Sequence, residues 1–305
     1  MAFTAADVKN LRETTGVGMM DCKKALTEAD GDFDKAIEIL REKGLAASQK
    51  KAGRIAAEGM AYAASIDGVG VVVEVNAETD FVAKNEKFVD FVKGVAATVA
   101  ANKPADLDAL MACKYAGTER TVTEQQQEMV LVNGENIKVR RFAFFTEGVS
   151  VPYIHAGGKI GVLVNLETDL TAEQVNEAGK DVAMQIAALN PRFWDKSQVT
   201  QDVLDEERKI MMVQMSNDPK MANKPEQVIA KIVDGKLNKF YAENCLLQQE
   251  FVKDNSMTVE KYIASAAKAL GGTVTFKNAV RFEKGEGIEK KQENFADEIA
   301  KMVKG

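Results

Sequence analysis

The residues with the greatest chemical promise lie at 70–85, in the sequence GVVVEVNAETDFVAKN. A run of valines predicts a buried strand, and the polar residues 76–80 predict a turn at its end. Phe81 then places a large ring where the chain should pass through solvent, directly after the carboxylate of Asp80. Loops after strand ends are where a rigid scaffold displays functional groups. An acid beside a bulky ring at such a tip can act as a wedge that carries a charge.

Both residues also have a purely structural interpretation. Asp80 could cap a helical turn that begins at Phe81, and Phe81 could pack back on Val82 or Phe88. The two interpretations of Asp80 are compatible, because a capped turn is a rigid platform for the ring. The local sequence leaves both open.

Conventional catalytic groups are scarce in this chain. It has one histidine, His155, so any Ser-His-Asp or Cys-His arrangement has to include that residue. GGKIG at 157–161 lacks the spacing of a phosphate loop, and GVGVVV at 68–73 lacks the third glycine of a dinucleotide loop. No cluster of carboxylates and histidine has metal-ligand spacing. We therefore expect a protein that is not an enzyme and needs no metal or cofactor.

His155 lies in VPYIHAGGKIGVLV, just before a run that predicts a buried strand. The simpler interpretation, which we favour from the local residues, is a hydrogen-bonded structural histidine near a sheet edge. The alternative is an exposed contact to a partner, because Tyr153, His155 and Gly157 alternate with residues expected to point inward.

The elements around the Glu-Thr-Asp turn recur later in the chain. GVLVNLETD at 161–169 repeats the strand and the turn of 70–80. Weaker echoes of a following helix and of a late strand come in the same order, so the sequence predicts two related subdomains. The copies differ directly after the turn, where one continues FVAKNE and the other LTAEQV. We infer that the residues shared by both copies serve the fold. Phe81 is not shared, so its presence needs another explanation.

A small helical module precedes the two subdomains. Thr4 and Asp7 have the spacing of a capping box, and three short helices follow. Gly44 is expected to close the third helix, which leaves 46–53 as a flexible link. Three short helices bury little apolar surface, so we expect this module to dock on something else.

The grouping of strands and helices predicts an α+β fold with antiparallel sheets, in which helices at 87–101 and 173–189 cover the strands. Two further helical stripes, interrupted by Pro219 and Pro225, predict an antiparallel helical hairpin. The expected division is a helical docking module at 1–55, a first core subdomain at 56–150, a second core subdomain at 151–285 with the hairpin inserted near 199–240, and a C-terminal helical module at 286–305.

The bulk composition excludes several classes of function. The chain has 305 residues and a formal net charge of −6. An acidic balance argues against a dedicated nucleic-acid-binding protein, whose affinity depends on a basic surface. Three widely spaced cysteines are typical of the reducing cytoplasm. The N-terminus lacks the pattern of a secretory signal, and no run of 18 apolar residues occurs, so we expect a cytoplasmic protein without membrane association.

Four motifs together resemble one known family. They are LRETTGVGMMDCKKALTEADGDFDKAIEILREKG at 11–44, ETDFVAKNE at 78–86, YIHAGGKIGVLV at 153–164 and VRFEKGEGIEK at 280–290. In this order, and over essentially the whole chain, they resemble the bacterial elongation factor Ts family. The resemblance implies a UBA-like N-terminal module, a core of two subdomains, an inserted coiled coil and a short C-terminal module.

The same resemblance implies a function. Members of the family are guanine-nucleotide exchange factors for elongation factor Tu, which they meet in its GDP-bound and nucleotide-free states. Thr79, Asp80, Phe81 and Val82 correspond to the segment that enters the GTPase domain of that partner. There the segment displaces Mg²⁺ and GDP and so allows reloading with GTP. The factor itself binds no nucleotide directly, and a higher-order complex with the partner is possible.

Further contacts carry over less directly from the family. The first bend of the N-terminal module resembles the part that docks on the GTPase domain; its residues are Leu11, Arg12, Gly18, Met19 and Met20. His155 resembles part of a core surface that meets a different domain of the partner, which raises the weight of its contact interpretation. One departure is GGKIG, where GRIG is common, so Lys159 has to supply any charge needed there.

Two other functions remain open at the level of the sequence. One is a UBA-like adaptor that binds proteins through residues 1–55 and has no exchange activity. The other is a metabolic enzyme that uses His155 as an acid or a base.

Overall fold

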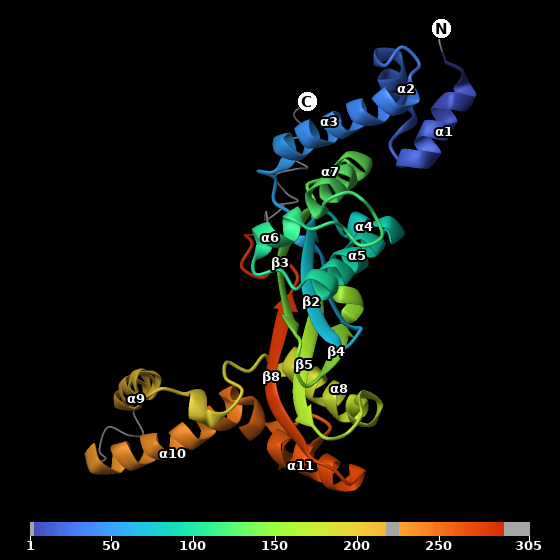
Figure 1. Ribbon diagram of the computed structural model, residues 1–305. Coiled ribbons are helices and arrows are strands. Elements are labelled where there is room, and N and C mark those ends of the chain that lie inside the picture. Colours follow the sequence, from blue (N-terminus) through green and yellow to red (C-terminus); the bar gives the residue numbers. More distant parts are fainter. Residues whose placement is uncertain (1–2, 218–225, 290–305) are drawn as a thin grey trace.

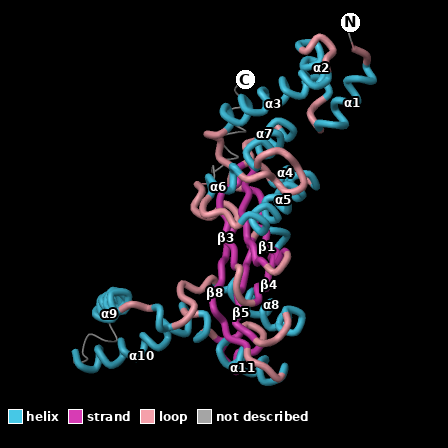
Figure 2. Tube along the Cα trace, in the orientation of Figure 1, coloured by secondary structure: helices cyan, strands magenta, loops and turns pink. Residues whose placement is uncertain are grey.

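The computed structural model describes residues 3–217 and 226–289. Two three-stranded antiparallel sheets form the centre of the molecule; they pack partly against each other and are staggered along its long axis (Figures 1 and 2). The first sheet has the order β1-β2-β3, and its strands are β1 (Glu58–Ile66), β2 (Val69–Ala77) and β3 (Lys138–Phe145). The second has the order β4-β5-β8, and its strands are β4 (Val149–His155), β5 (Ile160–Thr168) and β8 (Val274–Glu283). The antiparallel α and β mixture expected from the sequence is confirmed.

Both copies of the repeated strand lie at the centre of a sheet. β2 pairs with β1 and β3, and β5 pairs with β4 and β8, in each case antiparallel. β2 is buried along its whole length. A central strand has no free edge and can be apolar on both faces, which explains the continuous valine runs.

The two faces of β2 serve different layers. Val71, Val73 and Val75 point into a helix-covered core, whereas Val72 points into a small cluster with Leu163 of the other sheet. The sheets approach closely because small residues lie between them. A Cβ atom on Gly70 would stand 2.2 Å from Cβ of Ser150. The result is a layered core with the sheets inside and helices outside.

The helices over the first sheet are α5 (Glu86–Asn102), α6 (Leu107–Ala112) and α7 (Val122–Asn133). The apolar stripe expected at 87–101 is confirmed, because Phe88, Val92 and Val99 are buried in the first core. Helices α6 and α7 have no counterpart in the sequence-based prediction. Helices α8 (Ala172–Leu189) and α11 (Val259–Leu270), with the β6 (Glu250–Phe251) and β7 (Asp254–Thr258) hairpin, pack on the second sheet.

The N-terminal helices are α1 (Ala5–Thr15), α2 (Met19–Glu28) and α3 (Phe33–Lys51). They share a small core of their own around Leu11 and Leu26. The capping box of Thr4 and Asp7 is confirmed. The expectation that Gly44 ends the third helix was wrong, since α3 runs on to Lys51 through the supposed flexible link. Gly44 lies against the backbone of α7, and this tertiary contact overrides its weak helix propensity.

The two helices expected for the hairpin are present as α9 (Gln201–Ser216) and α10 (Glu226–Asn244), which contact each other and project from one end of the molecule (Figure 1). In Figure 1 α9 is seen nearly end-on while α10 lies across the view, so the expected antiparallel packing is not confirmed. The base of α10 is anchored by Phe240 and Cys245 in a separate apolar cluster. The expected C-terminal helix falls almost entirely on 290–305 and lies outside the described residues. Within the described parts of the chain, no helix is both long and apolar enough to cross a membrane.

Candidate functional site

The turn after β2 is a short helix, α4 (Asp80–Ala83), between β2 and α5. Thr79 is its N-cap, because the Thr79 side chain accepts a hydrogen bond from the backbone N–H of Val82 at 3.4 Å. The interpretation of Asp80 as the cap was therefore wrong by one residue. Asp80 occupies the first helical position, where a negative charge is favourable at the N-terminal end of the helix dipole. Residues 79–82 are called the tip below.

Phe81 is the most exposed large apolar side chain among the described residues, with 83% of its surface accessible. Its neighbours do not cover it. Phe88 is completely buried under the first sheet, and Val82 packs partly on the same core. The interpretation of Phe81 as a ring that packs back on Val82 or Phe88 was therefore wrong. The main chain of the tip is anchored while the ring projects into solvent.

Asp80 and Lys84 form an ion pair on the surface of the tip. Lys84 Nζ lies 2.6 Å from Asp80 Oδ2. The hydrogen bond from Lys84 is the main reason why the pKa of Asp80 lies below its ordinary value of 3.8. In the same way, Asp80 raises the pKa of Lys84. The carboxylate is thus ionised at neutral pH and paired with Lys84.

Glu135, in the connection between α7 and β3, fastens the base of the tip. One carboxylate oxygen accepts hydrogen bonds from the backbone N–H groups of Glu78 at 3.1 Å and Thr79 at 3.0 Å. The other oxygen accepts the hydroxyl of Thr79 at 2.6 Å. Sequence reasoning missed Glu135 because it lies 56 residues from Thr79 and follows a helix with a weak apolar pattern.

The carboxylate of Glu78 makes a second set of contacts beneath the tip. Glu78 Oε1 accepts a hydrogen bond from the backbone N–H of Asn136 at 2.6 Å and lies 3.5 Å from the guanidinium of Arg54. The side chain of Asn136 donates to the carbonyl of Arg54 at 2.8 Å. Residues before β1, after β2 and before β3 are thereby tied together beneath the tip.

Glu74, inside β2, carries a buried charge near this end of the sheet. Burial raises its pKa, but hydrogen bonds from the N–H of Gly285 and the side chains of Arg140, Asn76 and Arg141 outweigh burial and hold the pKa below its ordinary value. The Arg141 and Arg140 contacts measure 2.5 and 2.9 Å. Because Gly285 follows β8, this charge cluster joins the end of the second sheet to the first.

The second copy of the turn does not expose a large apolar side chain as Phe81 is exposed in the first copy. Asp169, which corresponds to Asp80, accepts hydrogen bonds from the backbone N–H of Thr273 at 2.7 Å and its hydroxyl at 3.0 Å. Leu170, at the position of Phe81, packs on the second core. The shared turn therefore holds the fold together in this copy, and the exposed ring is specific to the first.

The N-terminal bend lies against the helix that follows the tip. Gly16 ends α1 in a left-handed conformation (φ 69°), and a Cβ atom there would stand 2.8 Å from Lys87 Nζ in α5. Gly18 is the N-cap of α2, so Met19 and Met20 occupy the first turn of that helix, where they are 48% and 64% exposed. The bend thus presents sulfur-containing apolar side chains on the part of the molecule that carries the tip.

Two other candidate residues of the bend differ in position. Arg12 is exposed, and its carbonyl accepts the N–H of Gly16. Leu11 is completely buried in the N-terminal core. Leu11 can support the bend from inside but offers no surface to a partner in this conformation.

His155 lies at the exposed end of the edge strand β4. Its Nδ1 is 3.0 Å from the hydroxyl of Tyr153, so it is both hydrogen-bonded and accessible. The expected outward face was wrong for Tyr153, which packs partly on the second core, while Ile154 is 36% exposed. The register of β4 places Tyr153 on the same face as the buried Val151, and this sets its direction.

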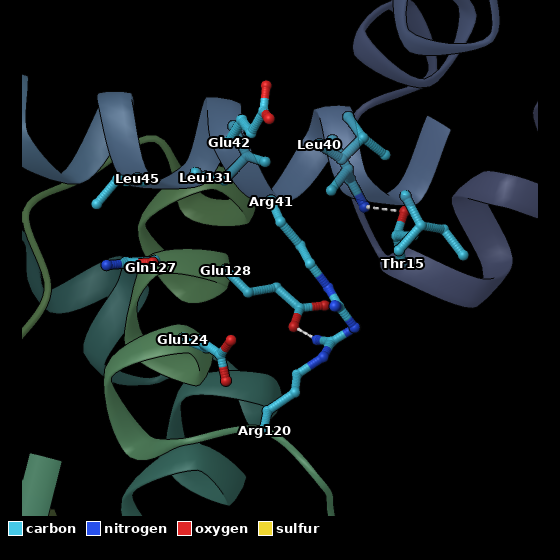
Figure 3. Close-up of a pocket in the computed structure, with 13 residues that line it drawn as sticks. Thr15, Leu40, Arg41, Glu42, Leu45, Arg120, Glu124, Gln127, Glu128 and Leu131 are labelled. Carbon is cyan, nitrogen blue, oxygen red and sulfur yellow. Dashed lines mark hydrogen bonds and ion pairs between the residues drawn. The ribbon is translucent and has the colours of Figure 1, made fainter. Parts of the chain in front are cut away.

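A groove of about 240 Å³ lies between α3 and α7. Figure 3 shows Arg41 and Arg120 reaching toward Glu128, with an ion pair between Arg120 and Glu128. Burial, and to a smaller extent the neighbouring Arg41, lower the pKa of Arg120. Leu45 and Leu131 form part of the apolar wall. No residue of the tip lines this groove, and we assign it to the packing of α3 on α7.

The described residues offer little for bond chemistry. Among them, no three His, Cys, Asp or Glu side chains gather in a way that could hold a metal ion. Cys22 and Cys245 are buried, and burial raises the pKa of both thiols. The most distinctive feature is the exposed ring of Phe81 beside the ionised carboxylate of Asp80, on a turn that is fixed by hydrogen bonds to Glu135.

Comparisons with known proteins point in one direction. A family model described as Elongation factor TS matches residues 78–286. The chain is 48% identical to Elongation factor Ts of Syntrophotalea carbinolica, with all of both chains covered. It is also 48% identical to the protein of that name from Clostridium kluyveri and 49% identical to that from Clostridium tetani, with 99% of each chain covered in both cases.

Proposed function

The chain belongs to the elongation factor Ts family, and from this premise we propose that it is the guanine-nucleotide exchange factor for elongation factor Tu. In this role the protein takes part in translation elongation, in the cytoplasm. The observation that supports the mechanism best is the position of Phe81, 83% exposed on a turn whose base is fixed by Glu135 and Thr79. Rigid, exposed aromatic residues are typical anchors of protein interfaces.

The proposed mechanism is mechanical and electrostatic. GDP is held in a GTPase by the backbone amides of a phosphate loop and by Mg²⁺, which neutralises the phosphates. The ring of Phe81 enters the partner and separates elements next to this site, while Asp80 disturbs the water network of the cation. Thr79 and Val82 hold the turn in shape from within. Each weakened contact lowers the barrier to release, and about 1.4 kcal/mol corresponds to a tenfold faster departure of GDP.

Exchange then follows from linkage between two binding events. The factor binds the nucleotide-free partner more tightly than the loaded one, so it stabilises the empty state. By reciprocity, an incoming nucleotide weakens the binding of the factor and expels it. No covalent step is required, so we propose that the protein is not an enzyme in the bond-making sense and uses no cofactor.

Other parts of the chain are proposed to supply affinity. We assign residues 1–55 to a UBA-like docking module whose contacts include Arg12, Gly18, Met19 and Met20. His155 contributes to a second contact on another domain of the partner. The core subdomains at 56–150 and 151–285, the hairpin and the C-terminal module at 286–305 complete the division.

The decisive experiment measures release of labelled GDP from purified elongation factor Tu. We expect Phe81→Ala and Asp80→Ala each to lower the acceleration about tenfold or more. Their free energies of unfolding should change by less than about 0.5 kcal/mol, because both side chains lie on the surface. Val252→Ala is the matched control, since Val252 is also an exposed apolar residue but lies in the β6–β7 turn.

Other outcomes would identify other functions. If the wild-type protein binds elongation factor Tu without accelerating release, it is an adaptor. If the two tip variants match the wild type while the protein remains an exchange factor, the tip is a structural turn and another surface opens the partner.

A further inference from the structure

Glu135 has an environment that local structure alone does not require. Gly134 ends α7 in a left-handed conformation (φ 73°), and this turn brings Glu135 beside the end of β2. Its carboxylate then accepts three hydrogen bonds, all from Glu78 and Thr79. The two residues lie 57 and 56 positions away in the chain. A single side chain thus satisfies the backbone on which the tip begins.

The hydrogen bond between Glu135 and Thr79 also affects the conformation of the tip. Because the Thr79 hydroxyl donates its proton to Glu135, its remaining lone pairs are free to accept the N–H of Val82. The carboxylate of Glu135 is charged, so the three hydrogen bonds that it accepts are stronger than bonds between neutral groups. The Thr79 rotamer, the first turn of α4 and the direction of Phe81 are therefore set together.

We infer that Glu135 is a positioning residue for exchange, which holds the tip in the orientation that enters the partner without itself touching it. This inference rests on the proposed function. A side chain of the free protein that is already in its bound orientation has less entropy to lose on binding. The benefit belongs to the step in which the tip enters, after the N-terminal module has docked.

This division of steps gives the inference a kinetic signature. In Glu135→Ala the docking residues of the N-terminal bend are untouched, so the factor concentration that gives half-maximal exchange should stay within about twofold. The maximal rate of GDP release should fall about tenfold, the effect of losing the equivalent of one charge-assisted hydrogen bond. A general loss of folding would change both quantities.

A second variant tests the chemistry of the carboxylate. Glu135→Gln keeps one oxygen, which can still accept from the two backbone N–H groups, but its amide nitrogen cannot accept the Thr79 hydroxyl. We expect a maximal rate between those of the wild type and Glu135→Ala. Glu147→Ala removes an equal charge from an exposed side chain in the β3–β4 turn and should match the wild type.

The orientation of the tip is followed separately, in the free protein, by amide hydrogen exchange of Val82. Its protection should fall about tenfold in Glu135→Ala and less in Glu135→Gln. This measurement needs no partner, so it reports on the contact between Glu135 and the tip even where the proposed function fails. Failure of the proposed function itself would show as no acceleration of GDP release by the wild-type protein, and failure of the tip mechanism alone as full activity in Phe81→Ala.

The outcomes separate clearly. A lower maximal rate together with faster Val82 exchange, ordered wild type, Gln, Ala, supports a positioning role. Faster Val82 exchange with an unchanged rate overturns it, because Glu135 would then serve stability alone. A lower rate with unchanged Val82 exchange also overturns it, because Glu135 would then contact the partner directly.

Discussion

Phe81 and Phe88 show how one residue type takes opposite roles within seven positions. Phe88 lies in the apolar stripe of α5 and is completely buried, whereas Phe81 projects from α4. Exposing a ring to water is unfavourable, since burial of apolar surface contributes about 25 cal/mol per Å². The exposed ring on a fixed main chain is the feature on which the proposed contact with a partner rests.

Asp80 gives a pH-dependent prediction at the same scale. Its folded-state pKa lies below 3.8 because of Lys84, so the ion pair stabilises the tip above that value and is lost as the pH falls through the lowered pKa. In Lys84→Ala we expect the pKa of Asp80 to rise toward 3.8. Carbon-detected NMR titration of the carboxyl group measures this directly.

Asp254 serves as the internal reference for that titration. Its pKa is also lowered, but by hydrogen bonds from Ser256, so Lys84→Ala should leave it unchanged. An Asp80 pKa that stays low in Lys84→Ala would assign the shift to the N-terminus of α4 instead.

At the scale of elements, β2 connects the two sheets with the tip. Its valines fill the core under α5, and Gly70 lets the second sheet approach. Glu74 and Asn76 pair with each other on the same strand at 3.0 Å. β2 therefore contributes apolar packing, a buried charge and the attachment point of the tip. Most of its residues make contacts that a substitution would disturb.

Gly70→Ala tests the close approach of the sheets. The new Cβ atom would overlap Ser150, so the sheets must separate or the strand must shift. We expect a loss of about 1–3 kcal/mol in the free energy of unfolding, measured by urea denaturation. Gly235→Ala is the control, because nothing lies within 4 Å of a Cβ atom there, and alanine in the middle of α10 should stabilise by about 1 kcal/mol. Equal stability of Gly70→Ala and the wild type would contradict the packing described.

At the scale of the whole molecule, the N-terminal helices and the tip, for which we propose separate tasks, have a common support. α7 packs on α3 (Figure 1). Gly44 of α3 lies against Gln127 of α7, and the connection after α7 carries Glu135. The N-terminal helices and the tip are therefore attached to the same helix. This arrangement is compatible with the proposed order, in which the factor first attaches and then inserts the tip.

Separate tasks predict separate kinetic effects. In the double variant Met19→Ser, Met20→Ser we expect the half-saturating concentration of factor to rise about five- to thirtyfold, the effect of losing about 1–2 kcal/mol of contact. The maximal rate of GDP release should remain that of the wild type, because the tip is unchanged. A lower maximal rate with an unchanged half-saturating concentration would mean that the bend takes part in the opening step.

The sequence by itself determined the features that depend on neighbouring residues. Valine runs and apolar stripes indicated the central strand of each sheet, the helix at 87–101 and the two helices of the hairpin, because these patterns follow the local period of the backbone. The four quoted motifs indicated the family before any coordinates. The unusual place of Phe81 was likewise visible from its position after a strand.

Only the tertiary structure decided which distant groups meet. It moved the cap from Asp80 to Thr79 and continued α3 through Gly44. It also introduced Glu135, which follows α7, a helix with too weak an apolar pattern to be found by periodicity. The physical reason is common to all three. A capping or packing choice worth about 1 kcal/mol locally is outweighed by contacts between segments that are far apart in the chain.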